Sequence, residues 1–474
     1  MKKILIYNWT QFDKPDGGGV TVYINNIINE MVKDPNISVT FLSSGTKYSL
    51  FRRKMFIKKT KNKYSNKVNS YTIYNSKTMF AINQFSRIDI YNLDDSIPQL
   101  LSKFIEEHGP FDVIHFNNLE GLSLNVLKLK EKYPQTKFIY SMHNYFPVCP
   151  NVYLWQHDKT NCLDYQNGKQ CLNCIFSDYN SAMKKLRILT IMEKFGIDVD
   201  SKIIKKIYVR FKKNRSNSQN NANLSTCTSQ DYKFFREKNV EFLNKYIDDI
   251  LCVSKRVAEI AVKYGINNEK CHVSYIGTRF ANNLQRQNDI NIYSDKFNLV
   301  YLGYMNSMKG FDFLIDSLNK LDKKVAKKIN LTLVCRNNAS YDINSILAKL
   351  KEKFNMVNYM DGYSHDMLPK ILHGQHLGVI PVVWEDNLPQ VSIEITSFGV
   401  PILSSNLGGA SELCSDSDFK FIGASTQDFN DKLTKIVNNR QKLLNFWKKY
   451  NKPTTMEEHL KELYNYYGIR RMIK

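Results

Sequence analysis

The fold is decided by the stretch WEDNLPQVSIEITSFGVPILSSNLGGASEL, which runs from Trp384 to Leu413. An apolar run precedes it, and it contains a polar turn, an apolar helical run, the short run PILSS and a pair of glycines. Pro389 fits an early helical position, where its missing N–H is no loss. Short apolar runs that alternate with helical runs indicate a parallel sheet with helices on both faces.

The same alternation continues in both directions along the 474 residues. The expected strands are 3–7, 38–43, 112–116, 137–142 and 249–254 in the first half, and 298–304, 331–335, 357–363, 377–382, 401–405 and 419–423 in the second. Each half has the layout of a doubly wound domain. We therefore expect an α/β protein with two facing Rossmann-like domains, which bind their ligand in the cleft at the carboxyl ends of the strands.

A polar, weakly periodic segment at 278–295 separates the two halves. The expected domains are 1–277, with an insertion at about 151–246, and 295–456, followed at 457–474 by a helix that packs back on the first domain. The apolar part of the N-terminus ends at Asn8, which predicts a buried strand and not a signal peptide. No apolar run approaches the roughly 18 residues of a membrane span, so we expect a cytoplasmic protein.

The charge balance is strongly basic, with 67 Lys and Arg against 45 Asp and Glu, a net charge of +22. Much of the excess lies at 51–67 and 201–215. Such runs attract phosphate, on a nucleic acid or on an anionic lipid surface. No nucleic-acid module accompanies them, so a membrane surface is the expected partner; the alternative is an ordinary solvated face.

Four of the nine cysteines lie close together in the sequence: Cys149, Cys162, Cys171 and Cys174. The last two have the spacing with which two thiolates reach one metal ion, and a structural zinc needs four ligands. The first two are too far apart to form a matching pair. Two interpretations stay open, a structural zinc that holds a long loop, and thiols or a labile disulfide.

Two carboxylates stand eight positions apart around the helix start of the opening stretch. The N–H groups near Gln390 form a site for a diphosphate. Glu394, in the first turns, can accept hydrogen bonds from a vicinal diol such as that of a ribose. Asp386, in the turn, can accept hydroxyls of a sugar-like group. The alternative is that Glu394 complements the helix dipole and Asp386 is a turn residue.

Three other segments place polar groups at strand ends. Lys309 precedes Gly310 at a helix start, where it can neutralise a phosphate. The run DGGGV follows the first strand, and Gly18 and Gly19 would bring backbone N–H groups close to a ligand. His143 follows a strand directly and can reach the cleft.

Taken together, these motifs resemble the retaining GT-B glycosyltransferases of family 4, the glycosyl transferases group 1. The resemblance covers nearly the whole chain except the inserted segment. It rests on GGGV near the start, His143, Ser254 in CVS, the spacing of Gly303, Lys309 and Gly310, the acid-x7-Glu element, FGVPILSS and GGASE. Each piece alone is weak, but the ordered set is specific.

The resemblance implies a donor site in the C-terminal domain and an acceptor side in the N-terminal domain. Glu394 would bind the ribose, Asp386 the donor sugar, Asn387, Leu388, Pro389 and Gln390 the sugar and diphosphate, and Lys309 the diphosphate. Gly18 and Gly19 would line the reaction centre, with His143 near the anomeric carbon. This chain departs from the family at Tyr304, where an arginine is usual, and at Asp386, where a glutamate is usual.

The implied activity is metal-independent hexosyl transfer with retention, in capsule, exopolysaccharide or lipopolysaccharide synthesis. The donor would be a nucleotide sugar, UDP-linked, which is a substrate, so no cofactor is expected. The acceptor would be a glycan or a lipid-linked glycan at the cytoplasmic membrane face, and no nucleic acid would take part. Two alternatives remain: a catalytically silent partner subunit, and a nucleotide-sugar epimerase or phosphorylase on a similar frame.

Overall fold

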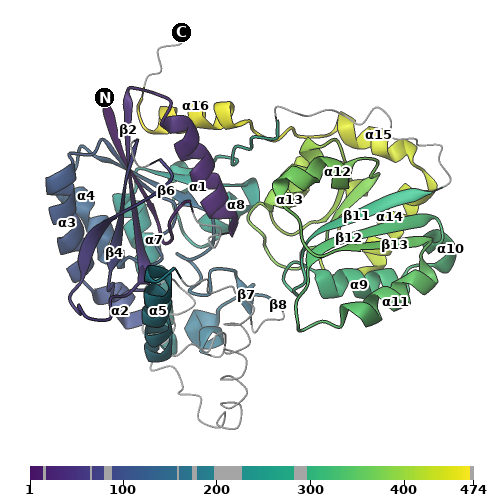
Figure 1. The fold of residues 1–474 in the computed structure, drawn as a ribbon, viewed down its shortest axis with the longest axis horizontal. Coiled ribbons are helices and arrows are strands. Elements are labelled where there is room, and N and C mark those ends of the chain that lie inside the picture. The colour runs from purple at the N-terminus through teal and green to yellow at the C-terminus, as the bar shows by residue number, and fades with distance from the viewer. Residues whose placement is uncertain are drawn as a thin grey trace.

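The structure is a computed structural model that describes residues 1–13, 18–64, 67–79, 88–156, 160–172, 174, 179–196, 227–281 and 296–469. These residues form two α/β lobes, each built around one large sheet (Figure 1). The two lobes are joined through residues 274–281 and, near the C-terminus, through 449–455. The basic run at 201–215 lies outside the described residues.

The first lobe contains an eight-stranded sheet in the order β10-β9-β6-β5-β1-β2-β4-β3. Its strands are β1 (Lys2–Asn8), β2 (Ile37–Lys47), β3 (Phe56–Thr60), β4 (Val68–Tyr74), β5 (Val113–Phe116), β6 (Lys137–Met142), β9 (Asp249–Cys252) and β10 (Cys271–Val273). All neighbours are parallel except β3 and β4. A small separate hairpin joins β7 (Trp155–Gln156) to β8 (Thr160–Asn161).

The helices of the first lobe are α1 (Gly18–Met31), α2 (Ile88–Leu93), α3 (Ser96–His108), α4 (Leu129–Lys132), α5 (Tyr179–Lys194), α7 (Ser229–Tyr246) and α8 (Lys255–Lys263). Helix α1 buries Ile24, Ile27, Ile28 and Met31, the i, i+3, i+4, i+7 pattern of a helix on a sheet. Helix α7 begins with a capping box between Thr228 and Asp231. Its buried aromatic residues join the core of this lobe, although it belongs to the segment expected as an insertion.

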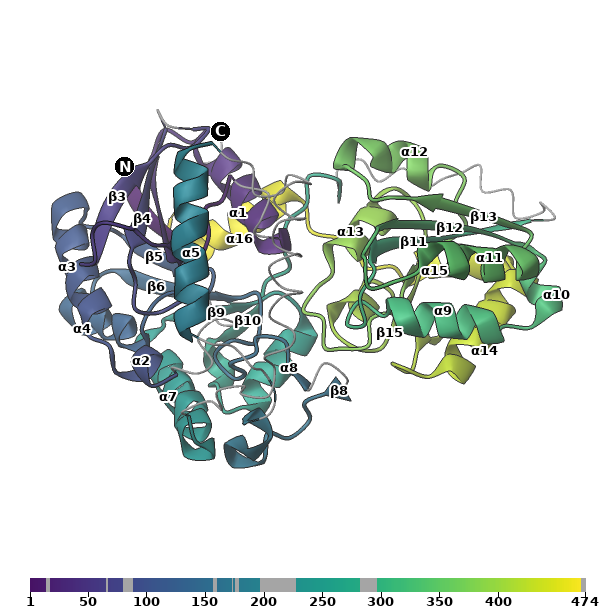
Figure 2. The same cartoon turned by 60° about the horizontal axis from the view of Figure 1, so that its bottom comes forward.

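The second lobe contains a fully parallel sheet in the order β13-β12-β11-β14-β15-β16. Its strands are β11 (Phe297–Tyr304), β12 (Ile329–Arg336), β13 (Met356–Met360), β14 (Leu377–Ile380), β15 (Ile402–Ser405) and β16 (Lys420–Phe421). Its helices are α9 (Phe311–Lys320), α10 (Lys323–Ala326), α11 (Ile343–Lys353), α12 (Leu368–Leu372), α13 (Gln390–Ser397), α14 (Thr426–Asn438) and α15 (Gln441–Lys448). Figure 2 shows α9 and α11 together over one face of the sheet.

The expected fold class, two facing doubly wound domains, is confirmed. All eleven expected strands are present, although several end earlier than predicted, as β13 does at Met360. The sequence analysis missed β3, β4 and β10. Strand β3 reads FIKKT and lies at the sheet edge with Lys58 and Lys59 exposed, so its cations mask the strand pattern.

The last described helix, α16 (Met456–Tyr466), crosses back and packs against α1 of the first lobe (Figure 1). It begins with a capping box between Thr455 and Glu458. A bridge between Thr278 and Thr455 brings the two connections between the lobes side by side. Within the described part of the chain, none of the helices combines the length and the apolar character that crossing a bilayer requires.

Candidate active site between the two lobes

The loop after β14 and the start of α13 form the second lobe's wall of the site. Pro389 is the N-cap residue of α13, just before Gln390, and not at the early helical position expected from the sequence. Glu394 lies one turn into the helix and is only 6% exposed. One of its carboxylate oxygens accepts a hydrogen bond from Tyr363 Oη at 3.1 Å, and the other lies 3.0 Å from His365 Nε2. The hydrogen bond to Glu394 raises the pKa of His365, which favours its protonated form.

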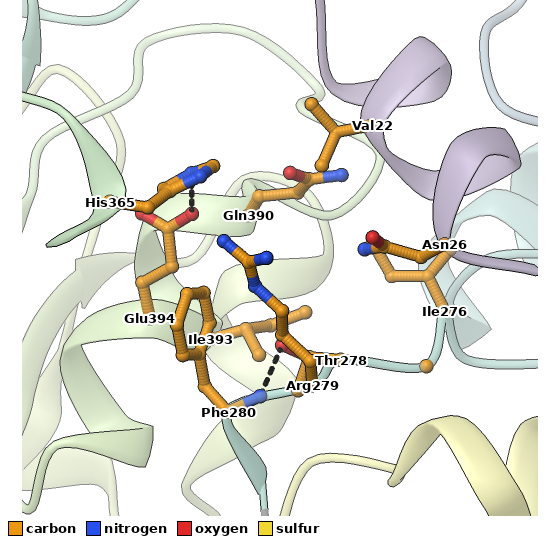
Figure 3. Close-up of a pocket in the computed structure, with 11 residues that line it drawn as sticks. Val22, Asn26, Ile276, Thr278, Arg279, Phe280, His365, Gln390, Ile393 and Glu394 are labelled. Atoms are coloured by element: carbon orange, nitrogen blue, oxygen red, sulfur yellow. Dashed lines mark hydrogen bonds and ion pairs between the residues drawn. The ribbon is translucent and has the colours of Figure 1, made fainter. Parts of the chain in front are cut away.

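A pocket between the lobes opens beside Glu394 (Figure 3). Its wall combines α1, the connection between the lobes and α13. The lining residues are Val22, Asn26, Ile276, Gly277, Thr278, Arg279, Phe280, His365, Gln390, Ile393 and Glu394. Glu394 therefore faces the interlobe space and not the core of its own lobe.

Asp386 and Lys309 lie in direct contact, although 77 positions separate them in the sequence. The carboxylate of Asp386 lies 2.6 Å from Lys309 Nζ and is 5% exposed. The ammonium group also lies over the ring of Trp384, 5.3 Å from its centre. The phosphate-binding and sugar-binding residues expected from the sequence thus form one ion pair at the carboxyl ends of β11 and β14.

The remaining expected residues of the second lobe lie near this pair. Asn387 and Leu388 are buried, and the Nδ2 group of Asn387 has no hydrogen-bond acceptor among the described residues. A buried amide donor without an acceptor is unfavourable, so it is a candidate to bind a ligand. Tyr304 ends β11 and is 60% exposed.

The glycine-rich segment of the first lobe touches the start of α13 in the second. Residues 381–389, which lead from β14 to α13 and are expected from the sequence to contact the donor, are called the donor loop. Gln390 Nε2 donates a hydrogen bond to the carbonyl oxygen of Gly19 at 2.7 Å. A Cβ atom at Gly19 would lie 3.3 Å from the Gln390 side chain, so the close approach favours glycine. Gly18, the first residue of α1, has a φ of +62°, a conformation that glycine adopts without strain.

His143 directly follows β6 and is partly exposed. Its ring packs on that of Tyr23, with centroids 4.8 Å apart, and its Nε2 lies 3.2 Å from Asn117 Oδ1. Tyr23 Oη in turn lies 2.7 Å from Nε2 of His459, on α16. Burial lowers the pKa of His143 to about 3, with the neighbouring His459 adding to the effect, so the imidazole is neutral near pH 7.

The sequence analysis missed two interlobe contacts. Arg256, on α8, makes a bidentate ion pair with Glu385 of the donor loop, at 2.9 and 2.6 Å. Glu412 accepts hydrogen bonds from the first two backbone N–H groups of α8, at 3.0 and 2.9 Å, and from Tyr275 Oη at 2.7 Å. Both acids lie in the quoted stretch, but nothing in their spacing indicates a partner in the other half of the chain.

The four clustered cysteines line a second cavity together with Arg236, whose Nη2 donates to Cys171 Sγ at 3.1 Å. Burial raises the pKa of the Cys149 thiol to about 12. None of the nine cysteines forms a disulfide. Among the described residues, no three His, Cys, Asp or Glu side chains are arranged to hold a metal ion, so the zinc interpretation has no geometric support.

The comparisons with known proteins concern the second lobe and the fold of the chain. The family model "Glycosyl transferases group 1" matches residues 283–453. An uncharacterized 41.2 kDa protein in the cps region of Klebsiella pneumoniae is 26% identical over 179 residues, which are 37% of this chain and 47% of that protein. The chain thus matches about half the length of this curated relative.

Several solved structures resemble the whole chain. Alr3699/HepE of Anabaena in complex with UDP and glucose has a TM-score of 0.54 and 13% identity, and the match covers 98% of this chain and 99% of that one. The lipopolysaccharide outer core galactosyltransferase WaaB has a TM-score of 0.55, 13% identity, and coverage of 98% and 99%. Sucrose-phosphate synthase of Thermosynechococcus elongatus has a TM-score of 0.55, 12% identity, and coverage of 98% for each chain. At these identities the likeness establishes the fold alone. The second lobe therefore matches the glycosyl transferases group 1 family model, and the chain over its length has the fold of known GT-B structures.

Proposed function

We propose that this glycosyltransferase moves a hexose from a UDP-sugar to a glycan or lipid-linked acceptor, with retention of configuration, in the synthesis of a cell-surface polysaccharide. The observation that carries the proposal is the position of Glu394. It lines the interlobe pocket, where its carboxylate would accept the two hydroxyls of a ribose in place of Tyr363 and His365.

The diphosphate would lie between the N-terminus of α13 and Lys309. The first N–H groups of α13 carry partial positive charge, and Asn387 offers an amide donor without a protein acceptor. These groups are fixed before the donor binds, so they stabilise the charge that develops on the leaving nucleoside diphosphate. The reaction breaks the bond between the anomeric carbon and the phosphate oxygen and forms the bond to the acceptor oxygen on the same face. The acceptor proton passes to the departing phosphate.

The UDP and cell-surface assignments rest on relatives. One neighbouring structure holds UDP and glucose, and the curated relative lies in a cps region. The test is to incubate the purified chain with UDP-glucose, UDP-galactose and UDP-N-acetylglucosamine and to measure both the melting temperature and UDP release. A rise in melting temperature together with UDP release by one donor supports the proposal. A chain that neither binds nor hydrolyses any nucleotide sugar contradicts it. An acid-stable glycosyl-enzyme adduct, detected by mass spectrometry, would contradict the same-face route.

The acceptor side would work at an anionic membrane surface. Strand β3 exposes Lys58 and Lys59 at the edge of the first lobe, and Phe51 just before it is 89% exposed. Cations beside an exposed aromatic ring suit a lipid interface. We expect the chain to co-float with phosphatidylglycerol vesicles at low salt and not with phosphatidylcholine vesicles. Equal flotation with both would contradict this assignment.

A catalytically silent partner subunit is the second candidate. The short Asp386 side chain forms an ion pair with Lys309, so each of these two charges already has a partner before a donor binds. Nucleotide-sugar binding without any hydrolysis or transfer would favour this candidate over the first.

A further inference from the structure

Three cationic side chains along the interlobe cleft each have a carboxylate partner. The pairs are Arg256 with Glu385, Lys309 with Asp386, and His365 with Glu394. In each pair the two charges largely compensate one another. A diphosphate carries at least two negative charges, so a cleft made of these pairs alone would offer it no net positive charge.

Arg279 is different. It lies on the connection between the lobes, after β10, and lines the pocket together with Glu394 and Gln390. Figure 3 shows its guanidinium group reaching into the middle of the pocket, between these two side chains and Asn26 of α1. Its guanidinium carbon lies 5.0 Å from the centre of the Phe280 ring. Within the described residues, no carboxylate pairs with Arg279 and no acceptor receives a hydrogen bond from it.

An exposed arginine on an open surface needs no explanation, because water solvates it. Arg279 is itself exposed, but it lies in the pocket that Glu394 lines, next to the N-terminus of α13. The guanidinium group is planar and carries donors in a fixed fork, which matches two oxygens of a phosphate. An uncompensated guanidinium beside a helix N-terminus is an arrangement for binding an anion.

We propose that Arg279 binds the diphosphate of the sugar donor together with Lys309, and that it adds a positive charge with no carboxylate partner to that of Lys309, which Asp386 matches. This inference rests on the proposed function. It makes the connection between the lobes part of the donor site, because the donor would contact this segment and α13 at once. It also provides a cation on the side of the pocket formed by the interlobe connection, whereas the end of β11 presents the uncharged Tyr304.

The experiment is calorimetric titration of the full chain. UDP is first compared with GDP, ADP and dTDP, and the chain is then titrated with UDP, UMP and uridine. The variants are Arg279→Gln, Arg279→Lys and the matched control Arg53→Gln, which removes a charge from an exposed arginine of the first lobe. We expect Arg279→Gln to weaken UDP binding roughly 10- to 100-fold, because it removes a charge-assisted contact. Uridine binding and the Arg53→Gln control should be unchanged, and Arg279→Lys should retain more UDP affinity than Arg279→Gln.

A second measurement does not depend on the absolute affinity of the variants. The UDP affinity of the unaltered chain should fall more steeply with ionic strength than that of Arg279→Gln, since the variant lacks one charge pair. Wild-type UDP affinity in Arg279→Gln, or an equal loss for uridine and UDP, overturns the role of Arg279 and leaves the proposed function standing. An unaltered chain that binds none of the four nucleoside diphosphates overturns both.

Discussion

The two lobes line their common cleft with different chemistry. The second lobe presents charged groups in contact: Lys309 with Asp386, and Glu394 with His365. The first lobe contributes the Gly19 backbone and the uncharged Val22 and Asn26 of α1, with Arg256 as its charged group. His143, which packs on Tyr23 of α1, is neutral because burial lowers its pKa to about 3. The difference indicates that the two lobes have different roles in ligand binding. Under the proposed function, the second lobe would bind the nucleotide part of the donor, and the first would shape the space for the sugar and its acceptor.

The largest effect is expected when the cation Lys309 is removed from the second lobe's side of the cleft. Replacing Lys309 with Met takes away the group expected on the leaving diphosphate and leaves the buried Asp386 without a partner. We expect turnover to fall roughly 1,000-fold, as when an electrostatic stabiliser is lost, and the melting temperature to drop as well. Donor turnover and calorimetry would measure this. Lys320→Met, at an exposed ion pair on α9, is the control, and near-normal turnover of Lys309→Met would break the comparison.

The second test changes Glu394, the residue expected to bind the ribose. Glu394→Gln keeps the shape of the side chain but loses the charge that receives two hydrogen bonds. We expect kcat/KM to fall roughly 100-fold, mainly through weaker nucleoside binding, since hydrogen bonds to a charged acceptor are the strong ones. Uridine titration separates this from a general loss of folding. Glu352→Gln, on the exposed face of α11, is the matched control. Unchanged uridine affinity would contradict the role of Glu394.

The third test separates the lobes from one another. Arg256→Leu leaves Glu385 buried without its bidentate partner and weakens the contact between α8 and the donor loop. We expect the donor KM to rise roughly 10-fold with a smaller change in kcat, because the loop loses its positioning and the lobes their closure. Small-angle scattering should show a larger radius of gyration. Lys255→Gln, next to it on α8, is the control. A normal KM with unchanged scattering would show that the lobes stay closed without this pair.

The smallest expected effect concerns the buried neutral histidines and the pH dependence of stability. Burial lowers the pKa of His459 to about 4 and of His115 to about 3, so both imidazoles stay neutral in the folded chain where the unfolded chain would protonate them. The unfolded state then binds more protons, and each group costs stability as the pH falls from about 6.5 towards its folded pKa, up to about 1.4 kcal/mol per pH unit. Denaturant titrations between pH 7 and 5 should show a shallower pH dependence for His459→Gln. An identical slope would contradict this assignment.

His365 affects the pH dependence of stability in the opposite direction. Its pKa is raised, first by the hydrogen bond to Glu394, so its contribution is complete below the ordinary histidine pKa. The contribution is lost as the pH rises through the folded value. Nucleotide affinity that weakens in alkali through loss of a positive charge in the pocket would agree with this sign.

Much of the second lobe could be predicted from its sequence because its signals are local. Pro389 marks the start of α13, and the position of Glu394 in the first turns follows from it. The strand runs at 298–304 and 377–382 are rich in Val, Ile, Leu and Tyr, as expected for central strands buried on both faces. In the first lobe, the sequence analysis missed β3 because this edge strand carries lysines on its exposed face.

The sequence by itself determined the two doubly wound lobes, the helix start beside the donor loop and the acids that flank it, because strand and helix periodicity depend on neighbours a few residues apart. Only the tertiary structure decided the partners. It paired Lys309 with Asp386, used Glu412 to cap α8, and placed Arg279, from a segment that reads as a polar boundary, in the wall of the pocket. These contacts join residues far apart in the chain, and they depend on how the two lobes meet.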